Sequence, residues 1–305
     1  MEGKTMMVNR QIQMRLGDRV FNWLNMVFLS LCLLVVCFPL LNIISQSISD
    51  PVSVLAGKVI LLPIKPTLVS YQKILQSSVL LSGFANSALI MALGTFLSVS
   101  LTILAAYPLA RKNLYGRNAF MWYFTFTMLF SGGLIPTYLV VMKLDMIDKL
   151  TAMIIPNAIS VWNIVISRTF FTNTIPEELY EAATIDGSSD LRTFFQIVLP
   201  LSKPILAVMT LFYAVGIWNS YFDAMIYMQT QNKFPLQLVL RNLLISSQLQ
   251  AQMLQNRGAD QSRNLADAEA LKYAVIIFSS LPLLLLYPFI QKYFVKGIMI
   301  GAIKG

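Results

Sequence analysis

A polar segment, residues 172–203, carries the most informative spacing in the chain. Its residue types suit the docking of another surface better than catalysis. Pro176 and the acids after it predict a helix over 177–185, because proline suits a first turn and acids suit the positive end of a helix dipole. Gly187 is expected to end this helix, and a second helix over 190–198 is expected to stop at a proline. The residues that carry this prediction are Glu177, Glu178, Glu181, Ala182, Ala183, Asp186, Gly187, Leu199 and Pro200.

The chain lacks the residue types that most catalytic centres require. It contains no histidine, which excludes Ser-His-Asp and Cys-His triads and any histidine-ligated zinc. No G-x-x-x-x-G-K-[ST] phosphate loop occurs, so the P-loop route of ATP hydrolysis is excluded for this chain. Cys32 and Cys37 lie in one apolar run and are interpreted as small core residues. We therefore predict a protein that is not an enzyme and holds no metal or cofactor of its own.

The composition is typical of a membrane protein. Apolar residues make up 56% of the chain and charged residues 12%, about half the charged fraction of a soluble domain. Six stretches lack Asp, Glu, Lys and Arg, and each is long enough to cross a hydrocarbon core of ~30 Å as a helix. These stretches are 20–49, 74–110, 118–142, 150–167, 204–222 and 273–291. We predict an all-α integral membrane protein with six transmembrane helices.

The placement of basic residues predicts the orientation of these spans. Lys and Arg occur in the N-terminal segment 1–19, in the short loop 111–117 and in the tail 292–305. The positive-inside rule places such segments in the cytoplasm, so both termini and the 172–203 segment are expected there. The polar loop 229–271, here called the outer loop, is then extracytoplasmic. The first apolar run is too long for a signal peptide, and we expect it to be retained within a six-span domain of residues 20–305.

Glycine and proline mark the breaks that we expect in these spans. Pro108 is expected to bend or end the second span. Gly132-Gly133, with Pro136 after them, should interrupt the third. The Leu-Leu-Ile run at 243–245 suggests that the outer loop contains short helices rather than disorder.

Polar and aromatic residues in or near the spans are candidates for contact with a solute, because ionisable groups inside a span usually face a cavity. At helical spacing, Trp218 and Tyr221 would share one face and Asn219 and Asp223 another. Rings suit the C–H faces of sugars, whereas amides and carboxylates suit their hydroxyls. The candidates are Trp218, Asn219, Tyr221, Asp223, Asn157, Trp162, Asn163 and Asn86. An aromatic belt at headgroup level, or polar contacts between helices, are the alternative explanations.

The spacing within the 172–203 segment resembles the E-A-A-x3-G-x9-I-x-L-P signature of the membrane subunits of bacterial ABC importers. The positions are filled by Glu181, Ala182, Ala183, Gly187, Ile197, Leu199 and Pro200. From residue 20 onward the chain resembles MalG-like permease subunits of carbohydrate uptake family 1 (CUT1). Further matching text is Ala105-Ala106-Tyr107 before Arg111, Ile135-Pro136-Thr137-Tyr138, and the stretch from Val295-Lys296-Gly297 to Ile303-Lys304-Gly305. Ser131-Gly132-Gly133-Leu134 looks most like the LplC- and YtcP-type oligosaccharide permeases.

This resemblance implies a type I ABC importer permease fold and the import of oligosaccharides across the bacterial cytoplasmic membrane. The implied partners are a second homologous permease subunit, two nucleotide-binding ATPase subunits that bind ATP and Mg, an extracytoplasmic solute-binding protein, the oligosaccharide and membrane lipid, but no nucleic acid. The helix over 177–187 would dock in an ATPase subunit and the outer loop would reach towards the binding protein. The tail residues Ile303, Lys304 and Gly305 would contact the ATPases.

Three other functions are less consistent with this sequence. An ABC permease for a non-sugar solute would share the signature segment. An ATP-independent carrier or channel would require coupling ions and paired carboxylates in the spans, where Asp223 is the one available. A membrane-embedded enzyme is disfavoured by the missing histidines.

Overall fold

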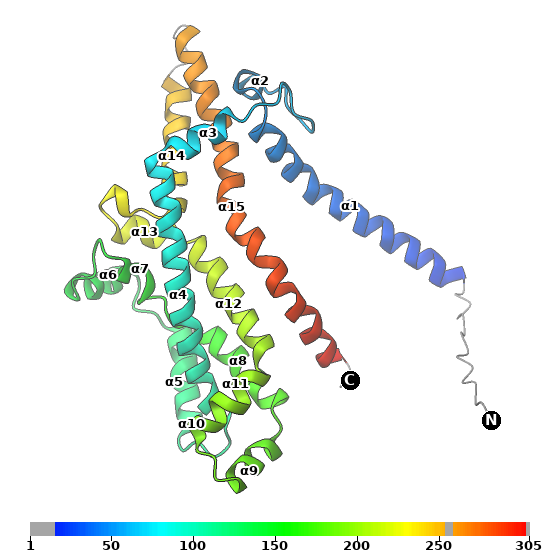
Figure 1. Cartoon of the computed structure of the whole chain (residues 1–305), viewed down its shortest axis with the longest axis vertical. Coiled ribbons are helices and arrows are strands. Elements are labelled where there is room, and N and C mark those ends of the chain that lie inside the picture. The colour runs from blue at the N-terminus through cyan, green and yellow to red at the C-terminus, as the bar shows by residue number, and fades with distance from the viewer. Residues whose placement is uncertain (1–15, 254–258, 303–305) are drawn as a thin grey trace.

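The computed structural model describes residues 16–253 and 259–302, and every regular element within them is a helix (Figure 1). The long helices are α1 (Leu16–Ser47), α4 (Ser78–Ala110), α12 (Lys203–Trp218), α14 (Leu236–Met253) and α15 (Ala259–Ala302). The shorter ones are α2 (Pro51–Leu55), α3 (Val69–Gln76), α5 (Arg117–Leu129), α6 (Leu134–Lys143), α7 (Leu150–Ile154), α8 (Val161–Thr174), α9 (Glu177–Ile185), α10 (Asp190–Thr193), η1 (Phe194–Val198), α11 (Leu199–Leu201), α13 (Phe222–Tyr227) and η2 (Gln231–Lys233).

Helix α4 lies at the centre of the bundle and packs against α8, α12 and α14 (Figure 1). Small residues let these helices approach closely, as is common between membrane helices. A Cβ added at Gly94 would lie 2.9 Å from Ile217 Cδ1, so the Ile217 side chain lies directly against the backbone of α4 and would have to shift to admit a larger residue. Deeper in the same interface, the buried hydroxyls of Thr102 and Tyr213 lie 2.6 Å apart and share a hydrogen bond. The α4–α12 contact is therefore held by close packing and by a polar pair.

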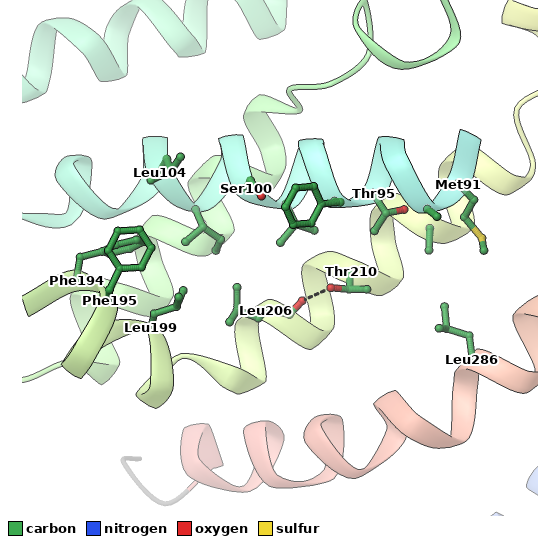
Figure 2. A pocket seen from close by; sticks show the side chains of 15 residues that line it. Met91, Thr95, Ser100, Leu104, Phe194, Phe195, Leu199, Leu206, Thr210 and Leu286 are labelled. Carbon is green, nitrogen blue, oxygen red and sulfur yellow. Dashed lines mark hydrogen bonds between the residues drawn. The ribbon is translucent and has the colours of Figure 1, made fainter. Parts of the chain in front are cut away.

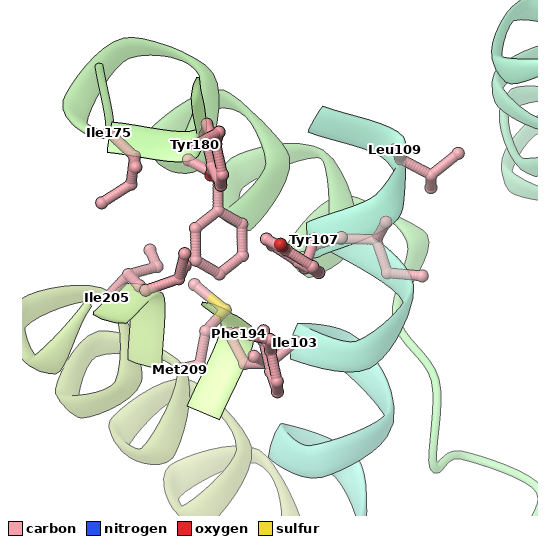
Figure 3. Close-up of a cluster of buried hydrophobic side chains, with 12 residues drawn as sticks. Ile103, Tyr107, Leu109, Ile175, Tyr180, Phe194, Ile205 and Met209 are labelled. Atoms are coloured by element: carbon pink, nitrogen blue, oxygen red, sulfur yellow. The ribbon is translucent and has the colours of Figure 1, made fainter. Parts of the chain in front are cut away.

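A cluster of buried side chains surrounds the C-terminal end of α4 (Figure 3). The Tyr107 ring is its centre, with ring centroids 4.8 Å from Phe194 and 6.1 Å from Phe171. Tilted and edge-on pairs of this kind stabilise a core beyond their burial alone. Because these residues come from α4, α8 and η1, the cluster joins the second span to the 172–203 segment. Helix α4 ends at Ala110, two residues after Pro108, as predicted.

Helix α1 departs from the bundle and runs away from it beyond its contact with α15 (Figure 1). Most of its large apolar side chains are exposed, including Phe21 and Trp23. A long helix that is apolar all round is typical of a membrane span.

The all-α membrane fold is confirmed, but the six-span count is not exact. Among the described residues, three helices are long and apolar enough to cross a membrane, or up to five if each of two bent pairs is one span. The pairs are α5–α6, bent by 110°, and Asp190–Leu201 with α12, bent by 79°. The fourth predicted span is divided into α7 and α8 by the irregular residues 155–160. The predicted spans were stretches without charged residues, and such stretches do not reveal where a helix is interrupted. This explains why six spans were predicted and fewer continuous ones are found.

The break between α5 and α6 lies at the predicted glycines. Gly133 has φ +85°, a conformation that side chains with a Cβ rarely adopt. Gly133 directly precedes α6, whose axis is bent by 110° from that of α5, so the third span is interrupted where these glycines and Pro136 predict.

The outer loop is more helical than predicted. Helix α14 has 18 residues, and α15 runs without interruption from within the outer loop to Ala302. The expectation of short helices was therefore wrong. Residues 236–253 contain no glycine or proline and are rich in Leu and Gln, which favours one continuous helix.

Asp148 fastens the α6–α7 connection to the start of the outer loop. Its carboxylate accepts hydrogen bonds from the backbone N–H groups of Gln229 (3.0 Å) and Thr230 (2.9 Å) and from the Thr230 hydroxyl (2.7 Å). The Lys233 ammonium forms an ion pair with it at 2.7 Å. Lys233 and these hydrogen bonds hold the pKa of the Asp148 carboxyl well below its usual range.

Candidate functional site

The first helix of the 172–203 segment forms where the sequence predicts it. Helix α9 spans Glu177–Ile185 and follows Pro176. Gly187, at φ +71°, ends it: its N–H donates to the Thr184 carbonyl (3.0 Å), and the Ser188 N–H donates to the Ala183 carbonyl (2.9 Å). These bonds satisfy carbonyls that the helix leaves free, and the left-handed conformation explains the glycine.

The second helical stretch ends at Leu201, one residue after the predicted stop at Leu199-Pro200, but it is not a regular α-helix throughout. Helix α10 begins after Ser189, whose hydroxyl accepts a hydrogen bond from the Arg192 N–H. The chain then forms a π-helical turn, η1, continues as α11 through Pro200 and breaks at Ser202. A proline in a helix removes one N–H donor and crowds the carbonyl four residues earlier. The wider π turn directly before it accommodates this crowding.

Helix α9 presents one face to the bundle and another to its surroundings. Tyr180 and Ala183 are its buried residues. Glu181 and Ala182 are exposed, and Ile185 is 86% exposed. Ile185 lies three and four residues after Ala182 and Glu181, so these three side chains share the exposed face of the helix. Sequence reasoning missed Ile185, although its place one turn after Glu181 and Ala182 is a signal for it.

Two basic residues at the end of α4 hold α9. The Arg111 guanidinium carbon lies 3.7 Å from the centroid of the Tyr180 ring, and Lys112 forms an ion pair with Glu177. Burial raises the pKa of the Tyr180 hydroxyl, while Arg111 acts in the opposite direction. The role of Arg111 was also missed, because nothing in the sequence links residue 111 to residue 180.

A cavity of about 650 Å³ lies between α4 and α12 and is bordered by η1 and by Leu286 of α15 (Figure 2). Its walls are mainly aliphatic and aromatic, and the hydroxyl of Thr210 on its wall donates to the Leu206 carbonyl of its own helix. Sugar hydroxyls require polar partners, so this lining does not suit them.

Two of the predicted solute-path residues meet. The Asn157 side-chain amide donates to the Asp223 carboxylate (2.9 Å), which also accepts from the Ser220 hydroxyl (3.0 Å). Asn157 lies in the break between α7 and α8, and Asp223 in the first turn of α13, so the contact joins two broken regions. Asn157 is exposed and Asp223 half-buried, which leaves polar atoms accessible to a hydroxylated molecule.

The expected face-sharing of Trp218 with Tyr221, and of Asn219 with Asp223, is wrong because α12 ends at Trp218. Trp218 is 1% exposed, and its indole N–H donates to the Ser279 carbonyl at 2.9 Å. Asn219 donates to the Val215 carbonyl of its own helix. Tyr221 is exposed.

The remaining candidates are scattered. Asn86 donates to the carbonyls of Asn232 (2.8 Å) and Phe234 (3.2 Å), and so holds the chain before α14. Trp162 is exposed and Asn163 buried. The tail residues Ile303, Lys304 and Gly305 lie outside the described residues, as does the N-terminal segment up to residue 15. Among the residues that the structure describes, no cluster of three acidic or thiol side chains could hold a metal ion.

Comparisons with known proteins agree with this architecture. Residues 98–300 match the family described as "Binding-protein-dependent transport system inner membrane component". The chain belongs to this family. This permease is 40% identical over 289 residues to the "Polygalacturonan/rhamnogalacturonan transport system permease protein YtcP" of Bacillus subtilis (strain 168), covering 94% of the permease and 99% of YtcP. It is also 40% identical to "Protein LplC" of the same organism, covering 95% and 96% of the two chains.

A solved structure extends the match to three dimensions. The permease superposes with a TM-score of 0.82 and 31% identity on a chain from a "bacterial ABC transporter involved in the import of the acidic polysaccharide alginate". The match covers 92% of the permease and 99% of that chain. The permease fold and the resemblance to LplC- and YtcP-type permeases are therefore confirmed.

Proposed function

We propose that this chain is a permease subunit of a binding-protein-dependent ABC importer that moves oligosaccharides across the bacterial cytoplasmic membrane. The energy comes from ATP hydrolysis in partner subunits, and catalysis is not a property of this chain. The observation that carries the proposal is helix α9 in a chain of this transport family. The helix exposes Glu181, Ala182 and Ile185 and ends in a turn at Gly187.

Oligosaccharides are the proposed cargo because of the relatives. One of them is named for polygalacturonan and rhamnogalacturonan, and the solved structure is described as importing alginate. Both names describe acidic polysaccharides, so oligogalacturonides are the first solutes to test. The Asn157–Asp223 pair offers an amide and a carboxylate, which suit sugar hydroxyls.

The proposed assembly contains a second homologous permease, two ATPase subunits that bind ATP and Mg, and an extracytoplasmic solute-binding protein. Both termini, the tail 292–305 and the 172–203 segment lie in the cytoplasm, whereas the outer loop faces the binding protein. Helix α9 docks on an ATPase subunit, with Glu181 in polar contact and Ala182 in close packing. The tail residues Ile303, Lys304 and Gly305 reach the ATPases in the same proposal.

The test is ATP hydrolysis by the complete complex in lipid nanodiscs, with and without oligogalacturonide-loaded binding protein. Wild type should be stimulated, and Gly187→Pro should abolish the stimulation because proline cannot adopt φ +71°. Failure of the wild-type chain to associate with an ATPase would refute the importer function. An intact complex that responds to a different solute class, but not to oligosaccharides, would instead support the alternative of a non-sugar ABC permease.

A further inference from the structure

Helix α9 has few attachments to the rest of the protein. Its buried side chains are Tyr180 and Ala183, of which Tyr180 alone is large. The remaining residues of α9 are exposed or half-buried. The position of α9 relative to the bundle therefore depends mainly on what surrounds the Tyr180 ring.

Two close neighbours of Tyr180, one aromatic and one cationic, come from the C-terminal end of α4: Tyr107 lies in its last turn, and Arg111 directly follows the helix. The Arg111 guanidinium lies over its ring at 3.7 Å, and the Tyr107 ring centroid is 6.3 Å away. Residues 107 and 111 are one helical turn apart, so they form a single surface against which Tyr180 rests (Figure 3 shows Tyr107 and Tyr180). Arg168 strengthens this end of α4, because its Nε donates to the Leu109 carbonyl at 3.0 Å.

The two basic contacts of α9 differ in strength. Arg111 Nη1 is buried and has no hydrogen-bond partner among the described residues, so contact with the Tyr180 side chain, above all with its ring face, stabilises a partly desolvated cation. The Lys112–Glu177 pair has side chains that are 71% and 42% exposed, and exposed ion pairs contribute little. Arg111 rather than Lys112 is therefore expected to fix α9.

The opposite end of α4 is fastened to the outer loop. Asn86 donates to two carbonyls before α14, and the Ser87 hydroxyl accepts from the Leu236 N–H at 2.8 Å. Between these contacts and Arg111, α4 is one continuous helix. The same rigid element thus touches the outer loop at one end and α9 at the other.

We propose that Arg111 is a positioning residue that clamps α9 to α4 through the Tyr180 ring, so that α9 moves with α4 when the outer loop changes position. This inference rests on the proposed function for its consequence, because the clamp would then transmit binding-protein docking to the ATPases. The clamp itself concerns contacts within this chain and can be tested separately.

The first experiment measures the clamp alone. Spin labels at Asn113→Cys and Asp186→Cys, in a chain without Cys32 and Cys37, report in lipid nanodiscs the distance between the turn that follows α4 and the C-terminal end of α9. A narrow distance distribution is expected with Arg111 present and a broadened one in Arg111→Gln. Equal distributions would overturn the proposal even if no ATPase binds, whereas failure of the wild-type chain to bind an ATPase refutes only the proposed function.

The second experiment measures the consequence in the complete complex, with oligogalacturonide-loaded binding protein as the stimulus. Arg111→Gln and Tyr180→Leu should lower the stimulation of ATP hydrolysis by roughly tenfold, as expected for loss of a partly desolvated cation–π contact. Tyr180→Phe keeps the ring and Lys112→Ala removes only the exposed pair, so each should stay within about twofold of wild type. Arg111→Lys keeps the cation but loses the planar group over the ring, so its stimulation should fall between those of wild type and Arg111→Gln.

The conservative variants distinguish loss of the Arg111–Tyr180 contact from loss of the folded protein. If Arg111→Gln does not accumulate, Tyr180→Leu compared with Tyr180→Phe decides the same point. Full stimulation in a folded Arg111→Gln complex, or an equal loss in Lys112→Ala, would overturn the role of Arg111. The solute moved per ATP hydrolysed should fall in Arg111→Gln while basal hydrolysis persists, which simple destabilisation would not produce.

Discussion

Replacing Gly187 by alanine tests whether the shape of the turn after α9 determines ATPase binding. Gly187 has φ +71°, and a Cβ added there meets no atom within 4 Å, so the substitution changes backbone energy without a clash. Holding an alanine in this conformation costs about 1–2 kcal/mol, or a factor of about 5–30 in an equilibrium. Because the Gly187 and Ser188 N–H groups end α9, we expect this energy to favour fraying of the turn.

The assay is the affinity of purified ATPase subunits for the permease pair in nanodiscs. If the turn is in its docking-competent conformation a smaller fraction of the time, the apparent affinity for the ATPase falls by the same factor, about 5–30-fold. Gly57→Ala is the matched control: Gly57 has φ +65° and equally open surroundings, but lies just after α2. Both variants should lose similar folding stability, and only Gly187→Ala should bind ATPase more weakly. Indistinguishable affinities for the two variants would refute the reasoning.

Three further predictions separate structural from functional roles. Asp148→Asn should lower the thermal midpoint at neutral pH. Because the folded-state pKa of Asp148 is depressed, the wild-type advantage is full above the unfolded pKa of about 3.9 and should decline progressively as pH falls from there towards the lower folded-state pKa. Tyr213→Phe should cost roughly 0.6–2 kcal/mol of stability, because its hydroxyl bonds to Thr102 and also accepts from the Ser160 N–H, and Thr102→Val should add little to it in a double-mutant cycle; fully additive losses would contradict the shared hydrogen bond. Trp218→Phe should lower the thermal midpoint but leave unchanged the solute concentration that half-stimulates ATP hydrolysis. Asp223→Asn should change that concentration. The reverse result would indicate that Trp218 contacts the solute.

The elements predicted correctly are those with local signals. Pro176, the acids that follow it and Gly187 determine α9 to the residue, because first-turn proline, the helix dipole and a left-handed glycine all act within a few positions. The end of α4 near Pro108 and the break at Gly133 follow from the same kind of evidence. In each case the deciding interaction lies within one turn of the residue that signals it.

The features that sequence reasoning missed depend on contacts between distant residues. Nothing near Arg111 indicates that its guanidinium covers the Tyr180 ring, and nothing near Trp218 indicates that its indole reaches the Ser279 carbonyl. No proline or glycine follows Trp218 to mark the helix end, so an unbroken helical face was expected there. A polar stretch follows instead, and the Asn219 side chain caps the helix by donating to the Val215 carbonyl.

The interruptions in the predicted spans are also the places where the candidate polar residues lie. In a membrane, irregular backbone is tolerated where it is buried in protein or lines a water-filled cavity, because lipid cannot satisfy its N–H and C=O groups. Asn157 and Asp223 both lie at such breaks and bond to each other, whereas Trp218, the last residue of α12, is buried in the core. A polar solute requires accessible hydrogen-bonding groups along its path, and an interrupted helix provides them as free backbone groups and polar side chains. The discontinuities around 155–160 and 219–221 are therefore better candidates for a solute path than the aromatic face expected on a continuous fifth span.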